Sequence, residues 1–233
     1  MAGFYPARVD LASSRSIRRP PHAIMRIIVP GLVLCAGRSS RMGQPKALLP
    51  TSRPGETFLG RVVRVLREGG IDDVVVVVGP ETPSLSPALE GENLAPRVVV
   101  NEAPDRGQLS SLLVGLTAVD RPGVGGVLVT LVDVPLIDDE TVRRLREAHE
   151  RSRAPVVRPV RDGRHGHPVI FDRAVFDELR QADLAAGAKA VVNAHLKRVE
   201  EVPVPLDGPF MDIDTPDDYR RIFNRAPPDL QSV

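Results

Sequence analysis

One short segment, Leu32–Pro50, combines small and basic residues in an order that suits phosphate binding; it reads LVLCAGRSSRMGQPKALLP. Gly37 and Gly43 let the backbone approach an anion closely, and the freed amide groups of such a loop can point at phosphate oxygens. Positive charge in the same loop comes from Arg38, Arg41 and Lys46, which can form charge-assisted hydrogen bonds to phosphate. We therefore predict a phosphate-binding loop lined by Ala36, Gly37, Arg38, Ser39, Ser40 and Gly43.

The spacing of this loop differs from that of two widespread phosphate motifs. In the Walker loop a lysine directly follows the second glycine, whereas Gln44 and Pro45 precede Lys46 here. The dinucleotide fingerprint needs glycines at a shorter spacing than this loop has. An ordinary surface turn after a parallel strand is the alternative, and two glycines with three basic residues in this order disfavour it.

Acidic residues stand where a divalent cation would complete such a site. Asp133 ends a buried strand, and in a doubly wound sheet its carboxylate emerges in the same crevice as the loop after the first strand. It could instead cap the next helix, but Asp138 already stands at that start. Asp212 and Asp214 alternate in a predicted short strand, which puts both on the same side, so either could join Asp133. Mg²⁺ usually takes one or two protein carboxylates together with phosphate oxygens, and we predict a Mg²⁺ site here.

Two further clusters carry polar side chains. Asn101 precedes a loop that leads into a helix start with two serines, the first being Ser110. Free amides and hydroxyls at a helix start suit phosphate or base contacts, so we expect Ser110 to bind the ligand and Gly79 and Asn101 to lie near its base and ribose. His165 and His167 are two residues apart and could bind zinc, but no cysteine or third histidine stands nearby in the sequence.

The hydrophobic pattern predicts the elements that bring these segments together. Continuous β-branched runs at 27–34 and 74–78 are typical of strands buried on both faces. Further strands are expected at 98–100, 127–132, 156–157, 169–171 and 199–204, and helices at 57–68, 108–119, 139–150, 174–179, 188–195 and from 216 onward. Alternating strands and helices predict a single α/β domain with a Rossmann-like, doubly wound, mostly parallel sheet, which binds ligands at the carboxyl ends of its strands.

The composition limits the classes of protein that the chain can be. With 233 residues, 42% hydrophobic and 26% charged, it has the size and composition of one soluble globular domain. A net charge of +1 and 3% aromatic residues disfavour a nucleic-acid partner, and no apolar run is long enough to cross a membrane. Cys35 is the single cysteine, so no internal disulfide can form, which fits the cytoplasm.

The chain ends are expected to lie outside the folded domain. Residues 1–26 are rich in arginine and contain prolines and a serine cluster, which is typical of a disordered tail. The predicted domain spans 27–225, and 226–233 form a short C-terminal tail.

Several of these segments resemble one family. The Ala-Gly, Ser-Arg-Met-Gly and Pro-Lys series of the first loop is similar to the signature of nucleotidyltransferases of the molybdenum cofactor type. That family also has a Gly-His-Pro-Val series, found here at 166–169, and an Asp-Ile-Asp-Thr-Pro series, found at 212–216. The segments follow the family's order from residue 32 to 219. Gln108 is a departure, because the family usually has methionine after this glycine.

The resemblance implies a fold of the nucleotidyltransferase type and roles for individual residues. The second acid of the Asp-Ile-Asp series joins the metal site in the family, so we favour Asp214 over Asp212. The Gly-His-Pro-Val series faces the acceptor substrate, so His167 is expected to recognise a phosphate or pterin in preference to zinc. The Ala-Gly and Pro-Lys pairs are closer to the cytidylyl than to the guanylyl branch.

Residues and resemblance together predict transfer of CMP from CTP to a phosphorylated acceptor such as molybdopterin, with release of pyrophosphate. The acceptor phosphate is already an anionic nucleophile, so catalysis reduces to alignment and charge neutralisation. Arg41 and Lys46 would screen the triphosphate, while Mg²⁺ on Asp133 and Asp214 would bridge the α-phosphate and the acceptor.

Four alternatives remain open at this stage. The chain could be a guanylyltransferase, a sugar-phosphate or phospholactate nucleotidyltransferase, or a non-catalytic protein that delivers molybdenum cofactor to a molybdoenzyme partner. A dinucleotide-binding oxidoreductase is disfavoured because the short-spaced glycines and the ribose-binding acid are missing.

Overall fold

A mixed β-sheet forms the centre of the molecule in the computed structural model, which describes residues 27–80, 82, 85 and 95–230. The strand order is β3-β2-β1-β4-β7-β5-β6, and β8 pairs with β5. The strands are β1 (Gly31–Leu34), β2 (Val74–Val78), β3 (Arg97–Val100), β4 (Gly126–Leu131), β5 (Val156–Arg161), β6 (Arg164–His165), β7 (Val169–Asp172) and β8 (Glu200–Pro203). The expected doubly wound α/β sheet is therefore confirmed.

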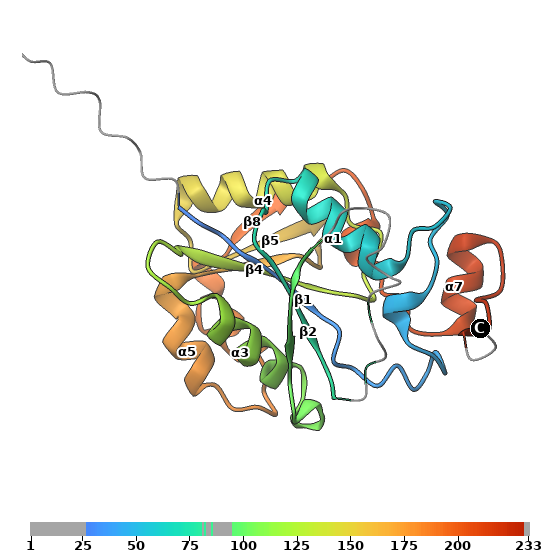
Figure 1. Ribbon diagram of the computed structural model, residues 1–233. Helices are drawn as coiled ribbons and strands as arrows, with labels where there is room; N and C mark the ends of the chain where they lie inside the picture. The colour runs from blue at the N-terminus through green and yellow to red at the C-terminus, as the bar shows by residue number, and fades with distance from the viewer. Residues whose placement is uncertain (1–26, 81, 83–84, 86–94, 231–233) are drawn as a thin grey trace, which may run out of the picture.

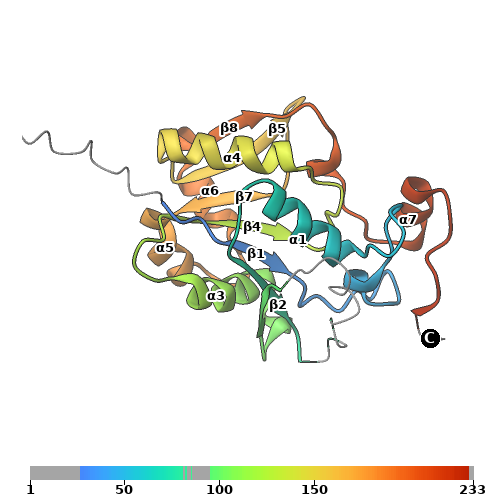
Figure 2. The ribbon, with the colours of Figure 1, turned by 45° about the horizontal axis from the view of Figure 1, so that its top comes forward.

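The helices cover both faces of this sheet. Figures 1 and 2 show α1 (Phe58–Glu68) and α4 (Asp139–Ser152) on one face, with α3 (Gln108–Val119) and α5 (Phe176–Gln181) on the other. Two apolar clusters result, and successive valines of β2 alternate between them. This alternation is why a run of five valines makes a good central strand: both sides of it are buried.

Helix starts lie where capping residues stand in the sequence. Thr57 caps α1, Asp138 caps α4 by accepting a hydrogen bond from the Thr141 amide, and Thr215 with Asp218 forms a capping box on α7 (Pro216–Phe223). Among the described residues a further short helix, α6, spans Lys189–Ala194. Asp138 thus performs the capping role that was the alternative for Asp133.

The second half of the sheet is antiparallel in part. Strands β1, β2, β3 and β4 pair in parallel, whereas β7 runs antiparallel between β4 and β5. The hydrophobic pattern does not distinguish these pairings, because strands of both orientations are apolar when buried. The carboxyl ends of β1, β2 and β4 consequently share one edge, where the predicted binding loops meet.

The structure covers the two ends of the chain to different extents. The tail expected at 1–26 lies outside the described residues. The strand expected at 27–34 is shorter, because only Gly31–Leu34 forms a ladder and Ile28 makes an isolated bridge to Val124. Near the C-terminus, the Leu230 amide donates to Gln44 Oε1 at 3.1 Å. Within the described part, no helix is long and apolar enough to span a bilayer.

Candidate active site

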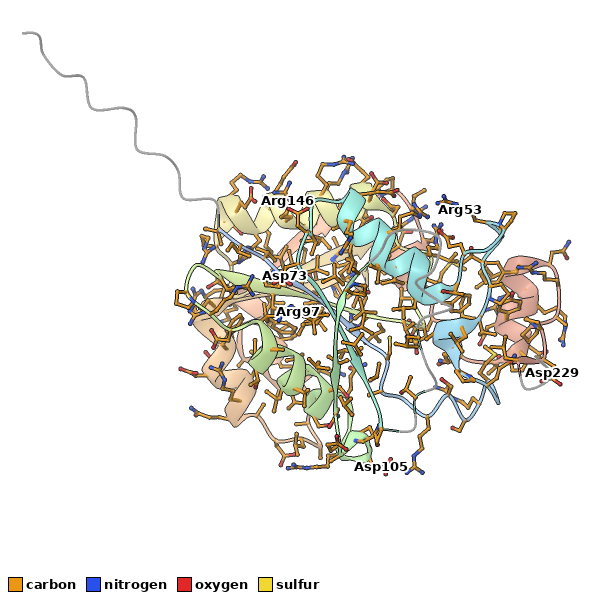
Figure 3. All side chains as sticks on the ribbon, in the orientation of Figure 1. Arg53, Asp73, Arg97, Asp105, Arg146 and Asp229 are labelled. Carbon is orange, nitrogen blue, oxygen red and sulfur yellow. The ribbon has the colours of Figure 1, made fainter. Side chains whose placement is uncertain are left out.

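A cavity of about 570 Å³ opens at the carboxyl ends of β1 and β2. Its wall contains every residue predicted to line the phosphate loop, together with Lys46 and Gly79. Thr82, Pro104 and Asp105 also line it, and Figure 3 shows Asp105 at the edge of the molecule. The sequence-based prediction of a loop that surrounds a ligand space therefore agrees with the position of this cavity.

The phosphate loop is folded by its own backbone. The amides of Met42 and Gly43 both donate to the Ser39 carbonyl at 3.0 Å, which closes a tight turn. Gly43 has a φ of 77°, in the left-handed region that a glycine adopts without steric cost. The Met42 side chain is buried in the core and anchors the turn. Ser39, Ser40 and Gly43 of this turn line the cavity, whereas the predicted catalytic residue Arg41 is not part of its wall and points to Asp214.

Lys46 lies between two acidic side chains that are distant in the sequence. Its Nζ is 3.0 Å from Asp133 Oδ2 and 2.6 Å from Asp214 Oδ1, and its side chain is only 8% exposed. Arg41 Nη2 adds a second cation 2.9 Å from Asp214 Oδ2. The four residues predicted to be catalytic or metal-binding therefore form one cluster.

Backbone contacts hold the two carboxylates in place. The Ile213 amide donates to the Asp133 carbonyl at 2.8 Å, so the loop after β4 and the segment before α7 are joined directly. Gly208 allows close approach of the same two segments, because a Cβ there would lie 1.8 Å from the Leu136 carbonyl oxygen. Asp133 and Asp214 are thus positioned by a main-chain contact, in addition to their ion pairs.

The carboxylates offer oxygen ligands suited to a divalent cation. Asp133 Oδ1 is buried and has no hydrogen-bond partner among the described residues. In the same part of the chain, no group of three or more His, Cys, Asp and Glu side chains is arranged to hold a metal. A pair of carboxylates fits Mg²⁺, which takes its remaining ligands from phosphate and water. Residues Asp133 and Asp214 therefore fit the predicted metal.

Burial and the negative charge of the cluster shift the pKa values of three neighbouring groups. Burial raises the pKa of Asp212, and the charge of Asp133 adds to that rise. Burial lowers the pKa of His167, whose Nδ1 lies 3.5 Å from the Val129 carbonyl oxygen. Burial also raises the pKa of the Cys35 thiol, with a further contribution from Asp133. Cys35 is therefore protonated at neutral pH and is no nucleophile.

The polar cluster at the start of α3 differs in detail from the sequence-based prediction. The Asn101 side chain is buried and donates to Ser110 Oγ at 2.9 Å and Ser111 Oγ at 3.0 Å. The Ser110 hydroxyl donates to the Gly107 carbonyl at 2.7 Å. Ser111, which was not among the predicted ligands, lines a second cavity of about 190 Å³ together with Asp133.

Asn101 therefore donates to both serines, and Ser111 in addition lines the second cavity. The sequence signal that could have identified Ser111 is the paired hydroxyl next to Ser110. Ser110 and Ser111 are the same residue type and differ only in their position on the helix.

The two histidines of the His-Gly-His segment lie in different surroundings. His165 Nε2 pairs with Glu201 at 2.8 Å on β8, while His167 lies close enough to Asp133 and Asp212 for their charges to affect its pKa. A Cβ on the intervening Gly166 would lie 2.0 Å from the Pro209 carbonyl oxygen, so the glycine permits close packing on the segment before α7. This arrangement does not support the zinc alternative.

A match to a known protein family decides which proteins this chain is related to. Residues 31–199 match the profile described as the MobA-like NTP transferase domain. The chain belongs to this family. The resemblance to molybdopterin nucleotidyltransferases, and with it the nucleotidyltransferase class, is confirmed.

Relatives of this NTP transferase include proteins with assigned names and solved structures. A probable molybdenum cofactor guanylyltransferase from Mycobacterium avium is 31% identical over 161 residues, which are 69% of this chain and 77% of the relative. The crystal structure of Rv0371c from Mycobacterium tuberculosis is 34% identical, with a TM-score of 0.71 and coverage of 85% of this chain and 98% of that one. A complex of Rv0371c with manganese is 32% identical, with a TM-score of 0.66 and coverage of 85% and 100%.

Proposed function

We propose that this NTP transferase transfers a nucleoside monophosphate from an NTP to the phosphate of a molybdopterin-type acceptor and releases pyrophosphate. The observation that carries the proposal is the position of Lys46, which is buried between Asp133 and Asp214 beside a loop-lined cavity. The name of the Mycobacterium avium relative supports the molybdopterin-type acceptor.

The chain's own residues would align two anions and neutralise charge. The backbone amides of the phosphate loop and the side chains of Arg41 and Lys46 would bind the triphosphate. The acceptor phosphate attacks the α-phosphorus, the bond between the α- and β-phosphates breaks, and pyrophosphate leaves with the electron pair. No protein base is needed, because the acceptor phosphate is already ionised at neutral pH.

A divalent cation would be held by Asp133 and Asp214, and the chemistry it supplies is neutralisation of phosphate charge. The manganese complex of Rv0371c supports a divalent cation of this kind, and Mg²⁺ is the ion that we propose. Arg41 and Lys46, which now pair with these carboxylates, are the cations that would turn to the triphosphate.

We propose GTP as the donor, because the curated relative is named a guanylyltransferase. The sequence-based expectation of CTP has no support from that relative. Cytidylyl transfer stays the second candidate on one specific observation, the Ala36-Gly37 and Pro45-Lys46 pairs of the phosphate loop. A pocket that hydrogen-bonds one base rejects another strongly, because its buried polar groups are then left unpaired.

The test is a screen of the four NTPs with purified protein, molybdopterin and Mg²⁺, in which pyrophosphate release is measured. We expect release with GTP that requires both the acceptor and the metal. Faster release with CTP would assign the protein to the cytidylyl branch. Tight molybdopterin binding without pyrophosphate release from any NTP would favour the delivery protein and overturn the proposal.

A further inference from the structure

A buried carboxylate lies outside the cavity, on the loop that connects Lys46 to α1. The Glu56 side chain is only 1% exposed. Thr51 Oγ1 donates to its Oε2 at 2.6 Å, and Arg64 donates to its Oε1 from Nε at 2.9 Å and from Nη2 at 2.7 Å. Arg53, labelled in Figure 3 on the side of α7, approaches the same carboxylate to 3.8 Å. A charge buried this deeply must be compensated by such partners.

Arg61 connects this carboxylate with the loop that carries Asp133. Its Nε donates to the Pro135 carbonyl at 2.6 Å, two residues after Asp133, and its Nη1 lies 3.9 Å from Glu56 Oε2. Pro135 is buried, so its carbonyl oxygen would lose a hydrogen-bond donor if Arg61 were removed. The planar guanidinium can hold two acceptors at once in a fixed geometry.

The same connecting loop also contacts the C-terminal segment that carries Asp214. The fully buried Tyr219 donates from its hydroxyl to the Pro50 carbonyl at 2.7 Å. Arg225 Nη2 donates to the Thr51 carbonyl at 2.6 Å. Residues 50–56 therefore contact the segment that carries Asp214, and Arg61 extends from the Glu56 cluster to the Asp133 loop.

We propose that Glu56 and Arg61 are positioning residues, which fix the loop of Asp133 relative to α1 and thereby keep Asp133 aligned with Asp214. This inference rests on the proposed function, for the kinetic effect and for the divalent-cation site at Asp133 and Asp214. Groups that orient metal-binding side chains from outside typically contribute about 10- to 100-fold to metal affinity or activity. Arg61 is a candidate for such an effect because it touches neither the cavity wall nor either carboxylate.

The chain offers a matched pair of variants, Arg61→Met and Arg64→Met. Both arginines lie on α1, one turn apart, and both pair with Glu56, but only Arg61 contacts the Asp133 loop. Arg64 makes the shorter contacts with Glu56. A purely structural role of the Glu56 cluster therefore predicts that Arg64→Met causes the larger loss in every measurement.

We expect the two variants to separate stability from alignment. Arg61→Met should weaken Mn²⁺ binding to the nucleotide-free protein by about tenfold, as measured by calorimetry. It should also lower kcat by about tenfold, while the KM for NTP stays within about twofold of the wild-type value. Arg64→Met should lower Tm more than Arg61→Met, yet leave Mn²⁺ affinity and kcat within about twofold. Arg61→Lys, whose amine can reach the Pro135 carbonyl, should recover part of the loss and replaces Arg61→Met if that variant fails to fold.

If the Arg61→Met variant had the same Mn²⁺ affinity and the same kcat as the wild-type protein, the inference would be overturned. Equal losses in Arg64→Met would also overturn it, since they would show a general effect of the cluster on stability. If the wild-type protein transfers no nucleotide, the proposed function fails, while the Mn²⁺ measurement still tests the positioning role.

Discussion

Two sets of ion pairs each contribute a side chain to the wall of the same cavity, and they differ in burial. Lys46 pairs with Asp133 and Asp214 with its side chain 8% exposed, whereas Arg38 and Asp105 pair at 2.6 Å with side chains 68% and 67% exposed. An exposed pair contributes about 0–1 kcal/mol and rearranges easily, but a buried one leaves an uncompensated charge when a partner is removed. The difference indicates that the inner cluster is held more rigidly than the outer pair, and the proposed function assigns catalysis to the inner cluster.

The largest effects are expected from the inner carboxylates. Asp133→Asn and Asp214→Asn keep the side-chain shape but remove charge, so each should lower kcat on the order of 1,000-fold while the folded structure is retained. Steady-state kinetics at saturating Mg²⁺, with circular dichroism for the fold, measures both. Asp212→Asn is the matched control and should be much milder. An inactive Asp212 variant beside an active Asp214 variant would show that Asp212, and not Asp214, binds the metal.

The next effect in size concerns the cation of the inner cluster. Lys46→Ala removes a charge-assisted contact to the triphosphate, so kcat/KM for the NTP should fall by about 100-fold. The fold should persist, although Asp133 and Asp214 then face each other without the ammonium, which should lower Tm by a few degrees. Thermal melts and kinetics on one preparation test this. Unchanged kinetics would mean that the phosphate loop is misassigned.

Only small effects are expected from the outer pair. Arg38→Ala should raise the KM for NTP by about two- to fivefold and change the free energy of unfolding by less than about 0.5 kcal/mol. Asp105→Ala should lower KM slightly, because it frees Arg38 for the triphosphate. Both effects should shrink at high salt, since exposed charges are screened. A loss of activity as large as that of Lys46→Ala would contradict the distinction between the two sets.

The smallest effect is a pH-dependent gain in stability. Burial and the neighbouring Asp133 raise the pKa of Asp212, so its ionised form is disfavoured in the folded state. Asp212→Asn should therefore raise the free energy of unfolding at pH 7. The gain should disappear as the pH falls below the ordinary aspartate value of about 3.9, where the wild-type residue is protonated in both states. Urea unfolding at several pH values measures this, and a loss of stability at pH 7 would contradict it.

The parts of the fold that follow from local physics could be predicted from the sequence. The run of five valines, the cap at Asp138 and the start of α7 at Thr215 lie where their residue types require. The position of β7 between β4 and β5 could not be predicted, because pairing order depends on long-range contacts that an apolar pattern does not encode.

The candidate site also has a part that could be predicted from the sequence and a part that depends on long-range contacts. Asp133 and the loop of Lys46 could be brought together from the rule that strand ends share a crevice, and the structure shows Lys46 in contact with Asp133. Asp214, which also contacts Lys46, could be named only from the family resemblance. The hydrogen bond between Asn101 and Ser110 could not be predicted from the sequence, although a buried amide must satisfy its donors. Their predicted roles at the ligand stay predictions. Arg61 gave no signal at all, because its contact with Pro135 joins residues 74 positions apart.

Transfer of isotopic label tests the central claim most directly. Wild-type protein and the Asp214→Asn variant are each incubated with molybdopterin, Mg²⁺ and GTP labelled with ³²P at either the α- or the γ-position. Nucleotidyl transfer predicts that the wild type moves the α-label to the acceptor and the γ-label to pyrophosphate, whereas the variant moves neither. Appearance of the γ-label on the acceptor, or equal α-label transfer by both proteins, would contradict the account.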